Sequence, residues 1–350
     1  MKIGLIPFGG DTNPYQELTR RALVAQGLDV RTFPKSNWLP LWRAAQTGVE
    51  VLHLDWPHSF YMGAGPVQSA IKRTQFLWQL SHLDGVKLVW TVHNLQSHDS
   101  AGRAEPELEW LARRVDALVS LSQKGVDLIH RRWPVTATKP ITVIPLGHFA
   151  DWYNTGLQKD EARQVLGVPV GAKLAVFAGR LQPYKGLELL IPAFQKVARQ
   201  NEWLLLAGEP SSAEYTERLR TLIKGHPRVI FQPRLLDRAE LGQAIATSDF
   251  AVFPFKEIFN SASVVLALSF GKPVVAPARG SLDEVIPQEA WFSMGQGSPG
   301  ELEAALWAAF RADDLPARGL IAARKMRIEH SWSIVGERLA SMYFSLGVKS

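Results

Sequence analysis

The sequence predicts an α/β protein built from two doubly wound parallel sheets, and three observations lead to this class. Short apolar runs alternate with longer segments of roughly 3.6-residue periodicity along nearly the whole chain, which is typical of parallel strands joined by crossover helices. The 350 residues suffice for two domains. A hydrophobic content of 46% is enough to fill a core in each of them.

The alternation sets the expected elements in order. In the first half we expect strands at 2–7, 49–54, 86–92, 116–120 and 141–145, and helices at 14–26, 67–83, 104–114 and 121–132. In the second half we expect strands at 173–178, 203–207, 228–232, 249–253 and 273–276, and helices at 185–199, 212–224, 237–246, 261–270 and 300–312. The periodicity breaks near 146–158, so we place one domain at 1–150 and a second at 151–330. A last helix at 331–346, capped by Ser331 or Ser333, lies within a terminal segment 331–350.

Composition excludes several classes of chemistry. The chain has no cysteine, so a disulfide framework, a zinc–thiolate site and a cysteine nucleophile are ruled out. The net charge of +6 has no basic tail, which favours anionic substrates or membrane headgroups over nucleic acid. No secretory leader and no apolar run of ~20 residues is visible. We therefore expect a cytoplasmic protein, soluble or peripheral at the inner face of the membrane.

The sharpest motif is Gly179-Arg180-Leu181-Gln182-Pro183-Tyr184-Lys185-Gly186, between a strand and a helix. Arg180 and Lys185 would place two cations in a loop at the positive end of a helix, beside backbone amides, which suits a diphosphate. The spacing is not that of a P-loop, since no Ser or Thr follows Lys185. An ordinary solvated loop is the alternative.

A second loop, 254–263, follows the expected strand 249–253 and leads into an apolar helix. Asn260, Ser261 and Ser263 are all residues that cap helices well. A capped, buried helix explains the segment without a ligand. The same hydroxyl and amide groups would suit an anionic or sugar-like ligand, so both interpretations stay open.

Two features of the first half follow strands. Gly9 and Gly10 come after the first strand and would let the backbone approach a ligand closely. His93 ends the strand 86–92, and strand ends line the ligand site in doubly wound sheets. His53 also lies at a strand end, but we assign it a structural role. The stretch Gly295–Gly300 matches a dinucleotide fingerprint but contains Pro299, and we interpret it as a turn with Ser298 as helix cap.

Together these motifs resemble the GT-B glycosyltransferases, specifically the large retaining group that includes glycogen synthase and sucrose synthase. The resemblance spans the chain, and Gly179-Arg180 with Lys185-Gly186 is its most specific part. It implies two Rossmann-like domains facing a central cleft, with the helix 331–346 crossing back to the first domain.

The resemblance also implies roles for individual residues. Arg180 and Lys185 would hold the donor's diphosphate, which the loop of Gly9 and Gly10 also approaches. His93 would bond the transferred sugar, and the backbone at Arg234 would meet the nucleotide base. In this group two glutamates eight positions apart contact sugar and ribose; here these positions are Ile258, with Glu257 one residue away, and Leu266. Glu257, Asn260, Ser261 and Ser263 are the side chains that could contact the donor there, and the ribose glutamate is replaced by a leucine.

The function that the resemblance implies is metal-independent hexosyl transfer, with retention, from a nucleotide-diphosphate sugar to a hydroxyl acceptor. No resident cofactor is expected; the donor would be UDP- or GDP-linked. The acceptor would be a lipid-linked or envelope glycan, and the protein could touch anionic membrane. For that contact we expect the segment 56–62 and helix 67–83, with exposed aromatic residues beside Lys72 and Arg73; a core helix with a charged outer face is the alternative. Two alternatives are a nucleotide-sugar epimerase and a non-catalytic nucleotide-sugar-binding protein.

Overall fold

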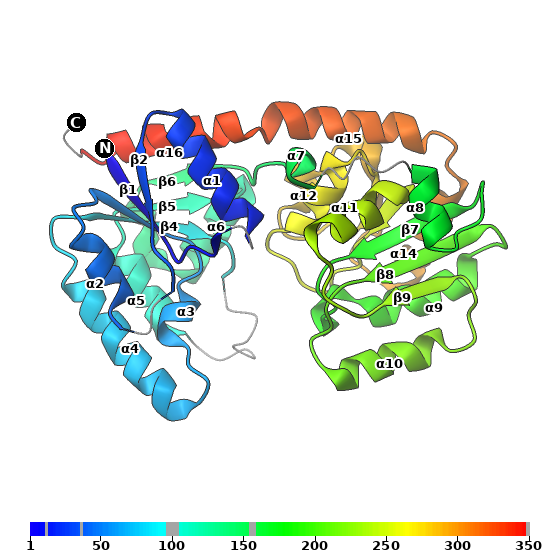
Figure 1. Ribbon diagram of the computed structural model, residues 1–350, viewed down its shortest axis with the longest axis horizontal. Helices are drawn as coiled ribbons and strands as arrows, with labels where there is room; N and C mark the ends of the chain where they lie inside the picture. Colours follow the sequence, from blue (N-terminus) through cyan, green and yellow to red (C-terminus); the bar gives the residue numbers. More distant parts are fainter. Residues whose placement is uncertain (11–12, 36–37, 96–104, 154–158, 348–350) are drawn as a thin grey trace. The chain divides into compact units, whose positions relative to one another are not determined.

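The computed structural model describes residues 1–10, 13–35, 38–95, 105–153 and 159–347. Contacts divide the chain into two units (Figure 1): unit 1 is Met1–Gly147 with His330–Ser350, and unit 2 is His148–Glu329. The sequence placed these divisions at 150 and 330.

Unit 1 contains one parallel sheet in the order β2-β1-β3-β4-β5-β6. Its strands are β1 (Lys2–Ile6), β2 (Asp29–Thr32), β3 (Val51–Leu54), β4 (Lys87–Val92), β5 (Ala117–Ser120) and β6 (Ile141–Val143). Its helices are α1 (Pro14–Ala25), α2 (Pro40–Ala45), α3 (His58–Tyr61), α4 (Pro66–Ser81), α5 (Pro106–Arg114), α6 (Gln123–Arg132), the 3-10 helix η2 (Pro134–Thr138) and α16 (Trp332–Ser345).

Unit 2 contains a second parallel sheet, ordered β12-β11-β10-β7-β8-β9. Its strands are β7 (Lys173–Ala178), β8 (Glu202–Ala207), β9 (Val229–Gln232), β10 (Phe250–Val252), β11 (Val274–Ala276) and β12 (Trp291–Ser293). Its helices are α7 (Ala150–Tyr153), α8 (Lys159–Val165), α9 (Leu187–Val197), α10 (Ala213–Ile223), α11 (Arg238–Thr247), α12 (Ala262–Ser269), α13 (Leu282–Val285), α14 (Pro299–Arg311) and α15 (Leu315–Glu329), with the 3-10 helices η3 (Pro183–Lys185) and η4 (Gln288–Ala290). The expected fold class, α/β with two doubly wound sheets, is confirmed.

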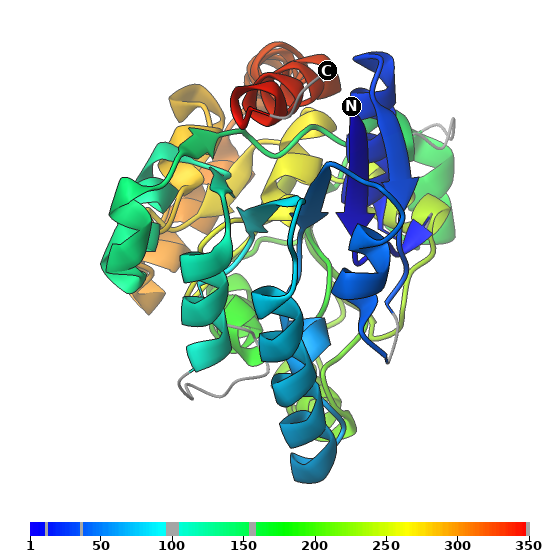
Figure 2. The same ribbon diagram turned by 90° about the vertical axis from the view of Figure 1, so that its left-hand side faces the viewer.

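The last helix, α16, packs on α1 within unit 1, and Figures 1 and 2 both show the first and last parts of the chain side by side. A Cβ on Gly336 would lie 2.7 Å from the Ala22 carbonyl oxygen, so glycine allows the close approach of the two helices. Leu339 and Tyr343 of α16 complete the core under β1 and β3. Ser331 caps the helix by accepting from the Ile334 amide at 3.3 Å, as expected.

Several elements were not predicted from the hydrophobic pattern of the sequence. The edge strand β2 has no fully buried residue, so it lacks an apolar run. The helix α15 has small residues on its buried face, including Gly319 and Ala322, which give almost no hydrophobic periodicity. Gly319 packs against the Gly271 backbone, where a Cβ would lie 2.0 Å from the carbonyl oxygen. At this position α15 is therefore held by close backbone packing and not by a large apolar side chain.

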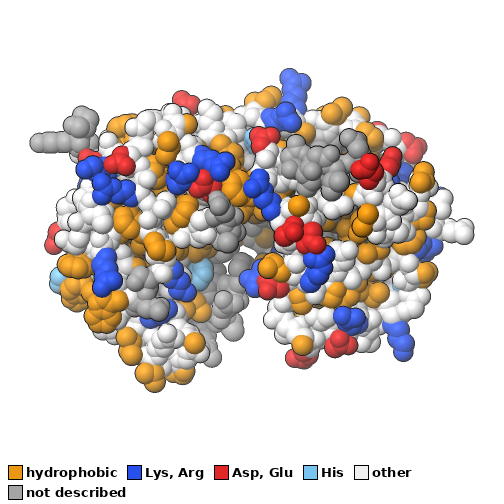
Figure 3. Space-filling model, viewed as in Figure 1, with side chains coloured by type: hydrophobic (Ala, Val, Ile, Leu, Met, Phe, Trp, Pro, Cys, Tyr) orange, Lys and Arg blue, Asp and Glu red, His pale blue; other side chains and the backbone are white. Residues whose placement is uncertain are grey.

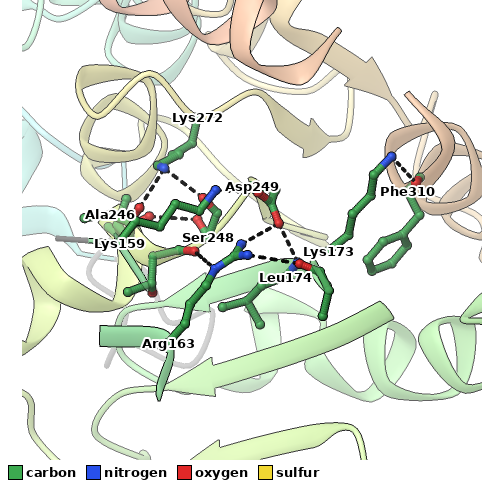
Figure 4. Close-up of polar contacts among 12 residues, drawn as sticks. Lys159, Arg163, Lys173, Leu174, Ala246, Ser248, Asp249, Lys272 and Phe310 are labelled. Carbon is green, nitrogen blue, oxygen red and sulfur yellow. Dashed lines mark hydrogen bonds and ion pairs between the residues drawn. The ribbon is translucent and has the colours of Figure 1, made fainter. Parts of the chain in front are cut away.

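At the amino edge of the unit 2 sheet, one carboxylate gathers several cations (Figure 4). Asp249 binds Lys159 and Arg163, both at 2.6 Å, and accepts from the Leu174 amide at 2.7 Å. Burial alone would raise the pKa of Asp249, but these hydrogen bonds outweigh burial and leave it lowered. Lys272 lies close by, donating to the carbonyls of Ala246 and Ser248 at 2.8 and 2.7 Å. The cluster ties α8 to the starts of β7, β10 and β11.

We predict that Asp249→Asn lowers the free energy of unfolding by about 3–5 kcal/mol, because it leaves partly buried cations without their carboxylate. Since the folded-state pKa of Asp249 is lowered, its stabilising contribution is present at neutral pH and is lost as pH falls through that value. Urea unfolding at pH 7 measures the effect. Asp160→Asn, on the exposed side of α8, is the control; equal midpoints for the two variants would contradict the assignment.

Candidate functional site

The loop 179–186 connects β7 to α9 and is held on both sides by backbone hydrogen bonds. The Leu181 amide donates to the Glu209 carbonyl at 2.8 Å, after β8, and the Lys256 amide donates to the Tyr184 carbonyl at 2.8 Å, after β10. Gly179 has φ 138°, a conformation that side chains disfavour. These bonds fix the loop across three carboxyl-end connections of the sheet.

Lys185, at the end of this loop, is a buried cation. Its residue exposure is 9%, and its amino nitrogen lies over the Phe177 and Tyr184 rings, 5.7 and 6.0 Å from their centroids. Within the described part of the chain, it forms no hydrogen bond and no ion pair. Burial, with a smaller effect of nearby Arg180, lowers the pKa of Lys185 to about 8. The amino group is thus desolvated, next to another cation, and would be stabilised by an anion.

Arg180 lies on the solvent side of the same loop. Its side chain is 66% exposed, and its Nε is 3.5 Å from Oε2 of Glu209. This exposed pair contributes little to stability. Arg180 and Lys185 therefore offer one exposed and one buried positive charge, and Glu209 is a counter-ion that the sequence analysis missed.

The loop 254–263 lies against the loop 179–186. A Cβ on Gly179 would meet the Ser263 hydroxyl at 3.1 Å and the Lys185 amino group at 3.4 Å, so glycine leaves room around both groups. Ser261 is the cap of α12, accepting from the Val264 amide at 3.2 Å. Ser263 is half-buried beside Gly179. The structure thus separates the two serines: Ser261 caps the start of α12, and Ser263 lies beside Gly179, on the side of Lys185.

The other predicted residues of this loop have different surroundings. Asn260 accepts from the Ser281 hydroxyl at 3.0 Å through its amide oxygen. Glu257 is exposed to solvent. Leu266 is buried within α12 and packs into the core. No carboxylate stands at that position of the helix, as the sequence indicated.

A carboxylate that the sequence analysis did not consider lies at the start of α9. Glu188 accepts from the Tyr215 hydroxyl at 3.0 Å and lies 3.8 Å from Lys256 and 3.9 Å from Arg218. It neutralises the positive charge near the helix start. Lys256 therefore forms an ion pair with Glu188, whereas Lys185 forms none with a described residue.

Arg234, in the turn after β9, is held by a local carboxylate. Its guanidinium forms two hydrogen bonds with Glu240, at 2.6 and 2.7 Å. Glu240 also closes a capping box with Asp237 at the start of α11. The side chain of Arg234 thus fixes the turn, and the role implied for its backbone toward a base stays a prediction.

In unit 1, Gln16 organises the loop after β1. Its side-chain oxygen accepts from the Gly9 amide at 2.8 Å, and its amide nitrogen bonds the Pro7 carbonyl. Gly10 has φ 60°, and a Cβ there would meet nothing within 4 Å. The two predicted glycines therefore lie in a loop that is pinned at Gly9 and open at Gly10.

His93 lies just after β4 and pairs with a carboxylate at the end of β3. Its Nε2 is 2.9 Å from Oδ1 of Asp55, and the two side chains are 10% and 5% exposed. Trp56 stacks on the imidazole at 4.3 Å, and the Tyr15 ring meets it edge-on at 4.9 Å. Gln16 lies 3.4 Å from the other oxygen of Asp55. We name Asp55, His93, Trp56, Tyr15 and Gln16 the His93 cluster.

Of this cluster, the sequence analysis singled out His93 as a site residue, and it placed Trp56 in the segment 56–62 expected at a membrane. Asp55 follows His53 by two positions in the strand-end run His53-Leu54-Asp55. A polar residue directly after a buried strand was the signal that could have found it. His53 itself is fully buried and bonds Tyr343 and Thr91; burial lowers the pKa of His53 to about 4, so it stays neutral at pH 7.

Other expectations concerned turns and ions. Ser298 caps α14 in a capping box with Glu301, so the Gly295–Gly300 stretch is a turn, as expected. Among the residues that the structure describes, no three His, Asp or Glu side chains form a group that could hold a metal ion. Over the same residues, no helix combines the length and apolar character needed to cross a bilayer.

Part of unit 2 is similar in sequence to a known family. Residues 172–311 match the family described as "Glycosyl transferases group 1". The GDP-mannose:glycolipid 4-beta-D-mannosyltransferase of Xanthomonas campestris pv. campestris is 28% identical over 237 residues, which cover 65% of this chain and 61% of that protein. The chain thus spans about three fifths of that relative's length. The class of enzyme expected from the sequence, a glycosyltransferase, is the class named for this family and for these relatives.

Solved structures of similar fold extend over the whole chain. Sucrose-phosphate synthase from Thermosynechococcus elongatus superposes with a TM-score of 0.76 at 19% identity, covering all of both chains. HepE of Anabaena, in complex with UDP and glucose, gives a TM-score of 0.76 at 17% identity, covering 99% of this chain and 100% of that one. These likenesses confirm the predicted two-domain GT-B fold.

The uncompensated charge of Lys185 generates a stability prediction. The pKa of Lys185 is lowered from 10.5 to about 8 in the folded protein. Between these pH values the unfolded chain binds more protons than the folded one, so the free energy of unfolding rises with pH. At pH 7 we expect Lys185→Met to raise the unfolding free energy by roughly 1–3 kcal/mol. Near pH 10.5 the difference should shrink. Paired denaturation of wild type and variant at both pH values measures it; a destabilised variant at pH 7 would show that the amino group has a structural partner.

Proposed function

We propose that this protein transfers a sugar from a nucleoside-diphosphate donor, bound by unit 2, to a hydroxyl acceptor. The observation that carries the proposal is the buried, unpaired amino group of Lys185 beside Arg180 in a loop kept open by Gly179. An isolated desolvated cation raises the free energy of the folded protein, and a bound anion offsets that cost. Selection for such an arrangement is most simply explained by ligand binding.

The donor group that fits this loop is a diphosphate. Lys185 and Arg180 supply two positive charges, and Ser263 supplies a hydroxyl donor near them. Negative charge accumulates on the diphosphate as the glycosidic bond breaks, so these fixed charges stabilise the transition state more than the ground state. The chain's own cations carry this role in the proposal, which makes the transfer metal-independent.

The base of the donor is proposed as uridine or guanosine. Support comes from the HepE complex, which contains UDP, and from the Xanthomonas relative, whose name specifies GDP-mannose. Because Leu266 replaces the ribose-binding glutamate that the resemblance implies, the ribose must be held by other groups. Asn260 and Glu257, in the loop before α12, are the nearest polar side chains in sequence.

The acceptor is proposed to be a lipid-linked or envelope glycan, reached at the inner surface of the membrane. The Xanthomonas relative is named for a glycolipid acceptor. In this chain, an exposed face of α4 carries Val67, Ile71 and Trp78, which are 75%, 55% and 41% exposed. The Trp42 ring of α2 lies 6.4 Å from that of Trp78. Figure 3 shows hydrophobic side chains gathered over α4 and α2. We name these four residues the α4 face.

This face differs from the one expected from sequence. Phe60, Tyr61 and Phe76, which were expected to be exposed, are buried and pack on one another, because α3 folds against α4. Arg73 is paired with Glu107 at 3.0 Å. Lys72 donates to the Met62 carbonyl at 3.0 Å and lies near Lys35, so positive charge still accompanies the apolar stripe. Apolar and aromatic groups with adjacent cations suit an anionic membrane interface.

Product analysis separates transfer from the two alternatives. An epimerase would release free nucleotide and an altered sugar without an acceptor, and a binding protein would leave the donor intact. Mass spectrometry of donor, nucleotide and acceptor fractions distinguishes the three.

Binding of the donor's nucleoside diphosphate can be measured as a change in stability. We expect UDP or GDP at a hundredfold excess over its dissociation constant to stabilise the folded protein by about 2.7 kcal/mol, seen as a thermal shift of a few degrees. Monophosphates should shift the melt less. Arg180→Ala and Lys185→Met should remove most of the shift, while Lys196→Ala, an exposed cation on α9 paired with Glu303, should keep it. No shift with UDP, GDP or ADP at millimolar concentration would refute the donor site.

Docking of the α4 face on a membrane can be measured with lipid vesicles. Wild-type protein should co-float with vesicles containing phosphatidylglycerol at low salt, and less so at high salt, because screening weakens the cationic contribution. The double substitution Ile71→Ser with Trp78→Ala should reduce co-flotation. Trp307→Ala removes a tryptophan of unit 2 that is 53% exposed, against 41% for Trp78, and serves as the matched control. Equal flotation of the double variant and wild type would exclude this face as the docking surface.

A further inference from the structure

Helix α15 of unit 2 carries large aliphatic side chains on the side that faces away from the core. Its buried residues are Leu315, Gly319, Ala322 and Met326. Leu320, Ile321 and Ile328, by contrast, are 73%, 42% and 56% exposed. A surface helix ordinarily places its large apolar residues toward the core and polar residues opposite them. Packing within unit 2 therefore does not account for these three side chains.

The exposed aliphatic residues share one stripe of the helix with two arginines. Leu320, Arg324 and Ile328 follow one another at four-residue spacing, and Ile321 and Arg327 flank them. At 3.6 residues per turn these five positions fall within about 120° of the helix surface, opposite the buried side. Arg324 and Arg327 are both exposed. We name these five residues the α15 face.

The positive charge of the α15 face is not neutralised within the described part of the chain. Arg324 and Arg327 form no ion pair with a described residue, and the five positions include no acidic residue. The other cations of the helix do have partners: Arg318 binds Asp314 at 2.8 Å, and Lys325 donates to the Glu284 carbonyl at 2.9 Å. The face thus combines aliphatic side chains with two cations that are available to an external anionic group.

We infer that the α15 face docks on the surface of an anionic phospholipid bilayer. Leu320, Ile321 and Ile328 enter the boundary between headgroups and acyl chains, as the apolar side of an interfacial helix does. The guanidinium groups of Arg324 and Arg327 stay at the level of the lipid phosphates while their aliphatic stems lie along the apolar region. The inference rests on the proposed function for the presence of a membrane at the site of transfer, and it assigns to unit 2 a membrane contact of its own.

A second copy of the chain fits this face less well than a bilayer does. A two-fold symmetric contact brings identical surfaces together. Arg324 lies in the middle of the stripe, so a symmetric pairing of two α15 faces would place like charges near one another with no carboxylate between them. An anionic bilayer offers negative charge and an apolar layer together, which matches both kinds of side chain on the face.

Fluorescent labelling tests the inference directly, because the chain has no cysteine of its own. Leu320→Cys and Ile328→Cys, each labelled with an environment-sensitive fluorophore on the full chain, should show a blue shift with phosphatidylglycerol vesicles. Thr221→Cys is the matched control, since Thr221 is exposed on α10, at the opposite margin of unit 2 from α15 (Figure 1). Its emission should not move.

The outcomes separate this inference from the membrane contact proposed for unit 1. If wild-type protein co-floats with the vesicles but neither α15 label shifts, the α15 face is not a docking surface and the contact through the α4 face stands. If wild-type protein does not co-float at all, both contacts are refuted. A wild-type oligomer that Leu320→Ser dissociates, without any change in flotation, would show that a second copy covers the face and would overturn the inference.

Substitutions test the two parts of the face separately. Two cations near an anionic surface account for about a thirtyfold difference in binding, so Arg324→Gln with Arg327→Gln should lower the vesicle partition coefficient by roughly that factor at low salt. Leu320→Ser with Ile328→Ser should lower it at least about tenfold. Arg220→Gln, which removes an exposed arginine from α10, should bind as wild type does. Equal partition coefficients for this control and both double variants would overturn the inference.

Discussion

Parallel pairing of the strands in both sheets is the constraint on which the rest of the structure depends. Each strand of a parallel sheet ends at the same edge, so the connections that follow β7, β8 and β10 must lie beside one another. This is why a lysine at 185, a glutamate at 209 and a serine at 263 share one neighbourhood although 78 positions separate the first and last. The same rule brings Asp55 and His93 together in unit 1.

The two edges of the unit 2 sheet each hold a buried lysine, and the two lysines differ in their hydrogen-bond partners. At the amino edge, burial lowers the pKa of Lys272 to about 8, yet its amino group donates to two carbonyls beside Asp249. At the carboxyl edge, burial lowers the pKa of Lys185 equally, and no described oxygen receives its hydrogens. Hydrogen bonding satisfies the first lysine within the fold, whereas the second has no such partner among the described residues, which is why we propose that it binds an anion. Contrasting partners, rather than burial alone, therefore distinguish the two lysines.

Local patterns predicted the sheets and the loop 179–186, because apolar runs and glycines between a strand and a helix can be recognised in consecutive residues. Long-range partners were not predictable in this way. Glu209 and Asp55 become visible only when neighbouring strands are placed in register, and Glu188 only when α10 brings Tyr215 to it. Helix α15 was missed because backbone packing at Gly319 replaces apolar periodicity. Phe60, Tyr61 and Phe76 were expected at the surface because sequence spacing does not show which face a short helix covers, whereas Trp78 is exposed as expected.

The two units differ in the charged groups that they gather at the carboxyl edges of their sheets. Unit 2 offers cations and hydroxyl donors at its carboxyl edge, which suit a leaving diphosphate, but its carboxylate Glu188 is engaged by Tyr215, Lys256 and Arg218. Unit 1 offers a different set, the carboxylate of Asp55 and the imidazole of His93, which aromatic rings hold in place. Exposed and buried cations suit an anionic ligand, whereas a buried carboxylate bonded to an imidazole fixes the orientation of that ring. The carboxyl edges of two sheets of the same topology therefore carry chemically different groups, because the loop sequences rather than the sheets determine them.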